Sequence, residues 1–232
     1  MRAKTVLGAG LATAAAGLIL GWPAWAVVTW ARYGRATHDP GRDPLLDRYL
    51  PTYDVAEVHE TRVAAPAART YSVAMTTGLQ RSAVVRAIFR ARELLMRVHD
   101  GGDGWPPGGI VAQMRAWGWG VLAEEPEREI VLGTVTQPWR GDVQFRALAP
   151  DEFAAFDRAG YVKLVTALAV EPLGADASRF RVETRVAATD ATARVRFRRY
   201  WAVFSPGIRL IRLAALRVVR RDAERRPPVV GR

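Results

Sequence analysis

The sequence predicts an α+β fold in which a curved antiparallel sheet wraps around a long C-terminal helix. Residues 161–172 and residues 178–189 predict the sheet, because both alternate apolar and polar side chains with the period of two that is typical of strands. Residues 207–221 predict the helix, because their apolar side chains recur with a period near 3.6. A sheet with one apolar face and an amphipathic helix bury these surfaces most simply against each other.

The strand at residues 178–189 shows the alternation most clearly. Phe180 and Val182 lie on one side of this strand, and Arg181, Glu183 and Arg185 lie on the other. In an antiparallel sheet this pattern is typical of a strand with one face packed and the other in water. We therefore predict that the charged face is exposed to solvent.

The long helix is predicted to begin after Thr189 or Asp190, since either side chain can cap a helix N-terminus. Pro206 and Gly207 are expected to kink or restart it. Beyond them an apolar stripe follows one side of the helix and is expected to lie over the sheet. The stripe consists of Ile208, Ile211, Ala214, Ala215, Val218 and Val219. The arginines expected to lie largely off the stripe are Arg209, Arg212, Arg217, Arg220 and Arg221.

Composition limits the kinds of chemistry that this chain can perform. Its 232 residues and 50% hydrophobic content suit one domain with an appendage. The absence of cysteine excludes disulfides, thiolate metal sites and cysteine nucleophiles. The net charge of +11 is concentrated after residue 189, where twelve arginines stand against three carboxylates. These arginines can form a solvated helix face, contact anionic lipid headgroups or contact nucleic acid; we expect no nucleic-acid partner.

The strongest local signal is the run from Thr5 to Trp30, which contains no charged residue and, at 26 residues, is long enough to cross a bilayer. We expect it to be a retained membrane anchor, which places the chain at the cell membrane as a single-pass protein. The same run also resembles a signal peptide cleaved near Ala26, which would release a secreted protein. A third possibility is a buried helix.

These signals divide the chain into four parts. Residues 1–35 are assigned to the membrane anchor or signal segment, residues 36–52 to a linker, residues 53–226 to the folded domain and residues 227–232 to a flexible tail. Within the domain we expect a first strand at residues 55–63, helices at about 66–77 and after 82, a hairpin at 119–136, a short strand at 143–148 and a helical turn at 150–156. The Gly- and Pro-rich residues 99–109 are expected to form a connector or a gate over a cavity.

Three segments carry a resemblance to a known family. They are VHETRVAAPAARTY from Val58, GWGVLAEEPEREIVLGTVTQPW from Gly118 and ATDATARVRFRRYWAVFSPGIRLIR from Ala188. Together with the order of elements, they resemble the helix-grip fold of the START-like superfamily, the polyketide cyclase and lipid-transfer group also called SRPBCC. The resemblance covers residues 53–226. It implies a deep apolar cavity between the sheet and the last helix, used in that superfamily for lipids, hormones, polyketides or quinones, and it carries over no catalytic residue.

The strand pattern and the resemblance together predict the wall of a ligand cavity. The wall is mostly apolar with a few hydroxyl groups, which is usual for small-molecule pockets. The predicted lining residues are Trp119, Val121, Ile130, Leu132, Thr134, Thr136, Leu164, Thr166, Leu168, Phe180, Val182, Thr184, Ile208, Ile211 and Ala215. A core filled by these side chains would produce the same alternation.

Acid–base chemistry would need a titratable group inside this space, and His59 and Glu60 are the candidates. Adjacent strand residues point to opposite faces, so that only one of the two can face inward. The three histidines lack metal-site spacing, and no serine stands in a nucleophile elbow. We therefore predict no catalytic residue, no metal and no cofactor.

The predicted function is membrane-associated binding or transport of a hydrophobic small molecule or lipid. An enzyme of the cyclase or hydrolase kind, acting on an apolar or polyketide-like substrate in the same cavity, is the first alternative. The second is an interaction module whose core is filled.

Overall fold

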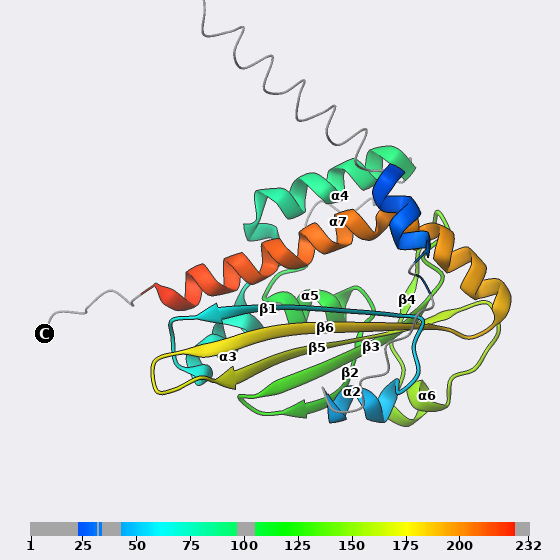
Figure 1. The fold of residues 1–232 in the computed structure, drawn as a ribbon. Coiled ribbons are helices and arrows are strands. Elements are labelled where there is room, and N and C mark those ends of the chain that lie inside the picture. Colours follow the sequence, from blue (N-terminus) through cyan, green and yellow to red (C-terminus); the bar gives the residue numbers. More distant parts are fainter. Residues whose placement is uncertain (1–22, 32, 34–42, 97–104, 226–232) are drawn as a thin grey trace, which may run out of the picture.

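The computed structural model describes residues 23–31, 33, 43–96 and 105–225. Within them, six antiparallel strands form one sheet in the order β1-β6-β5-β3-β2, with β4 paired to β3 at one end (Figure 1). The strands are β1 (Val55–Val63), β2 (Gly120–Glu125), β3 (Glu129–Thr136), β4 (Phe145–Arg146), β5 (Val162–Pro172) and β6 (Ser178–Ala188). All of them lie where the alternation predicts strands.

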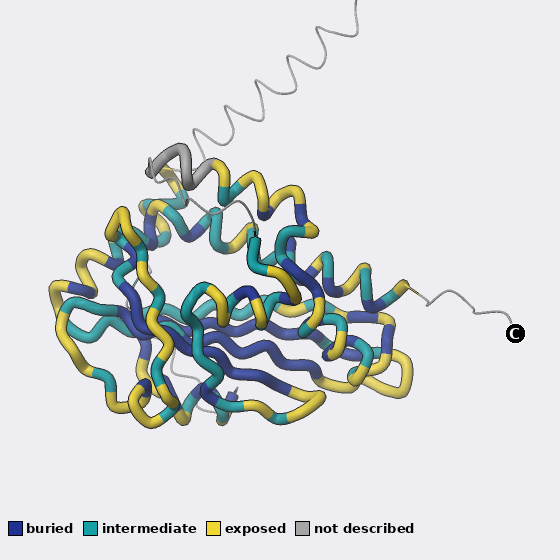
Figure 2. Tube along the Cα trace, turned by 180° about the vertical axis from the view of Figure 1, so that it is seen from behind, coloured by how far each residue is buried: buried dark blue, intermediate teal, exposed yellow. Residues whose placement is uncertain are grey.

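Helices cover both faces of this sheet. Helices α3 (Ala67–Thr76), α5 (Ile110–Ala116) and α7 (Ala191–Glu224) lie over one face, which we call the inner face. Helices α2 (Pro44–Tyr49) and α6 (Pro150–Ala155) cover the opposite, outer sheet face. The 3₁₀ turn η1 (Leu79–Arg81) leads into α4 (Ala83–Met96), which packs on α7. Figure 2 shows the central strands as a continuous buried layer between these helices.

The long helix α7 begins where the sequence predicts. The Asp190 carboxylate accepts hydrogen bonds from the backbone N–H groups of Thr192 at 2.7 Å and Ala193 at 2.9 Å, as an N-cap does. The helix continues through Pro206 to Glu224 and changes direction near its middle (Figure 1). An internal proline is the usual cause of such a bend, because its ring removes one helical hydrogen bond.

The prediction of a solvated outer sheet face is wrong. The exposed fractions of Arg181, Glu183 and Arg185 are 8%, 3% and 1%. Helix α2 covers them, although the sequence assigns its residues to a linker. Leu46, Tyr49 and Leu50 are buried on the sheet, and the Tyr49 hydroxyl donates a hydrogen bond to the Leu122 carbonyl at 2.7 Å.

Helix α5 is absent from the predicted elements, because the Gly and Pro residues directly before it are typical of a loop. Its N-cap, Gly109, packs so closely on α3 that a Cβ atom there would lie 1.9 Å from the Met75 carbonyl oxygen. The requirement for glycine is therefore steric. Residues 97–104, which include much of the predicted connector or gate, lie outside the described residues.

The membrane anchor prediction falls largely on residues 1–22, which also lie outside the described residues. In the described parts of the chain, no helix combines the length and the hydropathy needed to cross a bilayer. Residues 23–31, the end of the uncharged run, form a helix that contacts α7. The Trp25 indole donates a hydrogen bond to the Ser205 hydroxyl at 3.2 Å, and Arg198 stacks on the Trp30 ring.

Candidate functional site

The register of the strands places the predicted wall residues of β3, β5 and β6 on the inner face. Leu168 lies opposite Val182 on one side and Ile130 on the other, and Thr166 lies between Thr184 and Leu132 in the same way. Because directly opposed residues share a face, these positions form continuous rows across the sheet. Val121 lies opposite Leu132 and extends one row onto β2.

Two apolar clusters fill the ends of the space between the inner face and α7. At one end, Ile130, Leu132, Leu168, Phe180 and Val182 pack with α3 and with Leu216, Val219 and Ala223 of α7; we call this the α3 cluster. Trp119 and Val121 pack against its edge. At the other end, Val162, Val186, Phe197 and Trp201 form the Trp201 cluster, which Leu164 and Ile208 join. Ile211 and Ala215 are half-buried.

Between these clusters lies a row of polar side chains. The register places Glu57 of β1 opposite Thr184 of β6, and Thr184 opposite Thr166 of β5. The hydroxyl groups of Thr166 and Thr184 are 2.5 Å apart and hydrogen-bonded to each other. Arg212 of α7 forms an ion pair with Glu57, and the side chains of the two are only 14% and 20% exposed. We call Glu57, Thr166, Thr184 and Arg212, together with the neighbouring His59, the polar row.

The inward position of Arg212 corrects the expectation that the arginines of α7 lie largely off its sheet-facing side. The guanidinium group contacts Glu57 directly. Burial lowers the pKa of Arg212, and the charge of Glu57 opposes this effect. Burial likewise raises the pKa of Glu57, and Arg212 and Arg209 oppose that rise. Each charge therefore depends on the other.

His59 is the inward-facing member of the predicted pair, since it lies opposite Val182, while Glu60 is exposed. Its Nδ1 atom is buried and has no hydrogen-bond partner. Burial, together with the positive charges of Arg212 and Arg209, lowers the pKa of His59 to about 4. The imidazole is therefore neutral at pH 7 and carries an unused nitrogen beside the ion pair.

Glu57 and Arg212 are the residues of this site that the sequence analysis missed. Glu57 stands two positions before His59, so that the alternation of β1 places both on one face. This signal was present in the sequence. Nothing in the sequence of α7, in contrast, distinguishes Arg212 from the neighbouring arginines.

The hydroxyl groups of Thr134 and Thr136 are hydrogen-bonded to backbone carbonyl oxygens. The single Thr134 hydroxyl proton is shared between the carbonyl oxygens of Gly118 at 3.0 Å and Arg146 at 3.2 Å. The Thr136 hydroxyl donates to the Gln144 carbonyl at 2.7 Å. These bonds hold the segment around β4 against β3. The hydroxyl groups are thus engaged with backbone.

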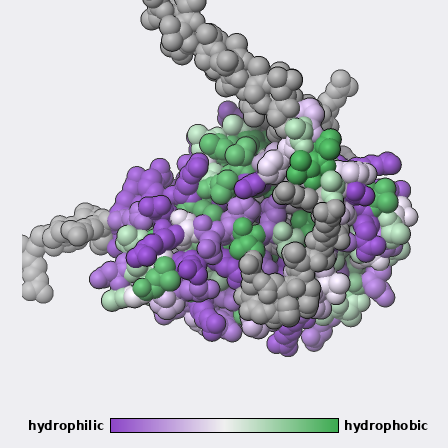
Figure 3. All heavy atoms as spheres, viewed as in Figure 1, coloured by the Kyte–Doolittle hydropathy of each residue, from purple (hydrophilic) through white to green (hydrophobic). Residues whose placement is uncertain are grey.

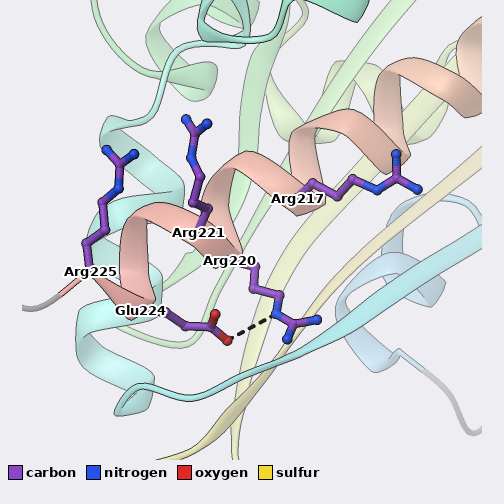
Figure 4. Close-up of a pocket in the computed structure, with 5 residues that line it drawn as sticks. All are labelled: Arg217, Arg220, Arg221, Glu224 and Arg225. Atoms are coloured by element: carbon purple, nitrogen blue, oxygen red, sulfur yellow. Dashed lines mark hydrogen bonds and ion pairs between the residues drawn. The ribbon is translucent and has the colours of Figure 1, made fainter.

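Two open pockets lie along α7, and none of the predicted wall residues lines either of them. The first, of about 360 Å³, is formed at the C-terminal end by Arg217, Arg220, Arg221, Glu224 and Arg225 (Figure 4). The second, of about 400 Å³, is lined by Trp139, Arg196, Arg199, Tyr200, Val203 and Phe204. Among the described residues, no group of three or more His, Asp or Glu side chains is arranged to hold a metal ion.

Comparisons with known proteins yield similarities to solved structures only. No family model matches the chain, and no curated protein matches it. The Zhui aromatase/cyclase from Streptomyces sp. R1128 is 15% identical, with 76% of this chain and 98% of that one covered and a TM-score of 0.30. Hypothetical protein jhp0584 from Helicobacter pylori is 10% identical, with 81% and 98% covered and a TM-score of 0.37.

Norcoclaurine synthase from Thalictrum flavum, in complex with dopamine and hydroxybenzaldehyde, is 14% identical, with 71% of this chain and 87% of that one covered and a TM-score of 0.31. These are similarities of fold alone. The order of the strands and the position of α7 establish that the chain has an α+β, helix-grip-like fold with an antiparallel sheet packed against a long C-terminal helix.

Proposed function

We propose that this protein binds a hydrophobic small molecule between the inner face of the sheet and α7, with the polar row holding the polar end of the ligand. The observation that carries the proposal is the position of Glu57, His59 and Arg212 between two apolar clusters. Buried charges and unpartnered polar atoms cost free energy, and apolar side chains of similar volume would stabilise a purely structural core at least as well. A polar group of a bound ligand would form hydrogen bonds with these side chains and so offset the cost of burying them.

The protonation states of the row indicate the ligand chemistry. A neutral His59 with its proton on Nε2 accepts a hydrogen bond at Nδ1, so that a hydroxyl group is the expected donor. Arg212 donates, so that a carbonyl oxygen of the ligand is a suitable acceptor beside it. The flanking clusters supply apolar contact area. The ligand class is therefore an apolar molecule with one oxygen-bearing end.

Location at a membrane is the second part of the proposal. The uncharged run from Thr5 to Trp30 would keep the domain next to a bilayer, either as a single-pass anchor or, before cleavage near Ala26, as a signal segment. Tethering would keep a poorly soluble ligand at a high local concentration. The run supports this location through its length and its lack of charge.

The test compares two probes of nearly equal shape, 2-naphthol and 2-methylnaphthalene, in fluorescence titrations of the full chain. The hydroxyl group should make 2-naphthol bind about tenfold more tightly, the effect of one net hydrogen bond. In His59→Phe this preference should disappear, while in the exposed control Glu60→Gln it should persist. Native mass spectrometry should also detect a co-purifying apolar molecule. Failure of both probes to bind, with no co-purifying molecule, would leave a filled core and overturn the proposal.

The same geometry favours a second function, acid–base catalysis on such a ligand. Glu57, with its raised pKa, lies on the same face as the neutral His59, and Arg212 can stabilise a developing negative charge nearby. Turnover of an aromatic polyketide that is abolished in His59→Ala, with 2-naphthol still bound, would establish a cyclase or hydrolase. Binding without turnover would establish a carrier.

A further inference from the structure

The side of α7 that faces away from the sheet carries a concentrated positive charge. Arg217 and Arg221 are exposed, and each lies about half a helical turn around α7 from Val219, which packs in the α3 cluster. Figure 4 shows Arg221 and Arg225 projecting together from one side of the helix, while Arg220 and Glu224 point to the other side. These arginines are therefore available to a partner.

Local carboxylates neutralise only part of this charge. Asp222 forms ion pairs with Arg81 at 2.7 Å, Arg221 at 3.4 Å and Arg225 at 3.7 Å. Glu224 forms an ion pair with Arg220 at 3.0 Å. Arg217 makes no ion pair within the part of the chain that the structure describes. Five arginines thus face two carboxylates, which leaves three positive charges uncompensated.

Exposed apolar side chains lie on the same side of the molecule. Val84 of α4 and Leu210 of α7 are 47% and 45% exposed, and Val27 and Val28 are 69% and 45% exposed. Figure 3 shows hydrophobic residues along α4 and hydrophilic ones where α7 ends. We call this surface, formed by residues 23–31, α4 and the far side of α7, the α4 face.

Two further observations identify what the α4 face contacts. The uncharged run from Thr5 to Trp30 reaches the domain at this face, because residues 23–31 pack on α7 through Trp25 and Trp30. The opposite end of the molecule, at α6, exposes the carboxylates of Asp151 and Glu152. The exposed Asp157, Arg146 and Arg158 near α6 leave that end close to neutral, in contrast to the basic end of α7. Arginines mixed with exposed apolar residues are typical of surfaces that lie on anionic bilayers.

We propose that the α4 face lies flat on a bilayer that contains anionic lipid. Apolar residues enter the headgroup boundary while Arg217, Arg221 and Arg225 contact the headgroups. This orientation holds the bend of α7 next to the lipid and the α6 end away from it. It rests on the proposed location at a membrane and does not depend on ligand binding.

The absence of cysteine allows a site-specific test on the full chain. Ala87→Cys on α4 and Ala155→Cys on α6 are matched exposed helix positions, and each is labelled with bimane. Vesicles of phosphatidylcholine, with or without phosphatidylglycerol, carry a nitroxide lipid as quencher. With phosphatidylglycerol, the label at position 87 should be quenched and the label at position 155 should not. Equal quenching at both positions, or quenching that is independent of phosphatidylglycerol, would overturn the orientation.

The contribution of charge is measured in the Ala87→Cys background. Arg217→Gln with Arg221→Gln should raise the lipid concentration needed for half-maximal quenching by about 30-fold, whereas the exposed pair Arg62→Gln with Arg140→Gln should change it much less. Similar effects of the two pairs would contradict a specific basic face. If duplex DNA competed with the vesicles and prevented quenching of the label at position 87, the basic face would be a nucleic-acid surface instead. Binding of 2-naphthol without vesicles is scored separately, so that failure here leaves the ligand proposal standing.

Discussion

At the scale of single residues, the outer sheet face shows how a charged side chain becomes part of a core. The Arg185 guanidinium donates to Glu183 at 2.8 Å and to the Leu50 carbonyl at 3.3 Å, and it also pairs with Asp47. The ring of Tyr53 lies 4.9 Å from its central carbon. This buried cation therefore has two carboxylates, a carbonyl oxygen and an aromatic ring as partners, which offset the cost of its burial.

Replacing Arg185 should be strongly destabilising. Arg185→Met leaves Glu183 buried with fewer partners and should lower the free energy of unfolding by about 3 to 5 kcal/mol. Arg179→Met is the matched control, because the Arg179 side chain lies on the same strand face but is 42% exposed and paired with Glu171 at 3.5 Å. This substitution should cost under about 1 kcal/mol. Urea unfolding followed by circular dichroism measures both. Equal losses would contradict the buried network.

Glu129 makes stability depend on pH. Its Oε1 atom and the Oδ2 atom of Asp43 are both buried without hydrogen-bond partners. Burial raises the pKa of Glu129, the charge of Asp43 raises it further, and Glu125 adds to the effect while Arg128 opposes it. The folded protein therefore holds a proton that the unfolded chain releases at a lower pH. Its contribution to stability is complete at acidic pH and is lost as the pH rises through the folded-state pKa.

Replacing Glu129 with an uncharged residue should make the free energy of unfolding depend less on pH. Glu129→Gln should unfold at a nearly constant urea concentration between about pH 7 and about pH 9, above the range in which His59 titrates in the unfolded chain, whereas the wild type loses stability over this interval. Glu60→Gln, at an exposed position on β1, is the control and should retain the wild-type slope. A wild type whose stability rises over this range would show that Glu129 is charged in the folded state.

At the scale of elements, α2 shows that a short helix inside a Pro-rich segment belongs to the domain. Asp43 caps it by accepting a hydrogen bond from the Leu46 N–H at 3.0 Å, and Pro44 occupies the first turn, where its missing N–H has no cost. Leu46 is fully buried among the outer-face residues. The helix closes the sheet face that holds Glu183 and Arg185.

Truncating the apolar anchor of α2 tests this role. Leu46→Ala should lower the free energy of unfolding by about 2 to 5 kcal/mol, as for other fully buried leucines. Leu173→Ala, in the exposed turn between β5 and β6, should have a small effect. Thermal unfolding of both variants supplies the comparison. If Leu46→Ala were as mild as Leu173→Ala, α2 would be a linker after all.

At the scale of the whole molecule, the residues that stabilise the fold differ from those that we propose to bind the ligand. The two apolar clusters hold α7 on the sheet at either end, and the ion pair of Glu57 with Arg212 lies in the interval between them. A buried ion pair contributes little net stability compared with apolar replacements, but losing one partner leaves an uncompensated charge.

A single and a double variant distinguish these contributions. Arg212→Met should destabilise the protein by about 3 kcal/mol or more, because Glu57 loses its partner. Glu57→Leu combined with Arg212→Met should restore or exceed wild-type stability while reducing the preference for 2-naphthol over 2-methylnaphthalene. Urea unfolding and the fluorescence titration are measured on the same samples. A double variant that keeps the full preference would confine ligand recognition to His59.

Periodicity in the sequence predicts the strands, their inner faces and the start of α7. It reports which side chains share a face, and the register confirms that Leu168 and Val182 lie opposite each other, as Thr166 and Thr184 do. It does not report what covers a face. The burial of Arg185 beneath α2, and the pairing of Glu57 with Arg212 across 155 residues of sequence, were decided only by tertiary structure. Whether a charged side chain is exposed to water or buried with a partner depends on elements that are distant in the chain. A local pattern of residues does not show which distant element will pack on it.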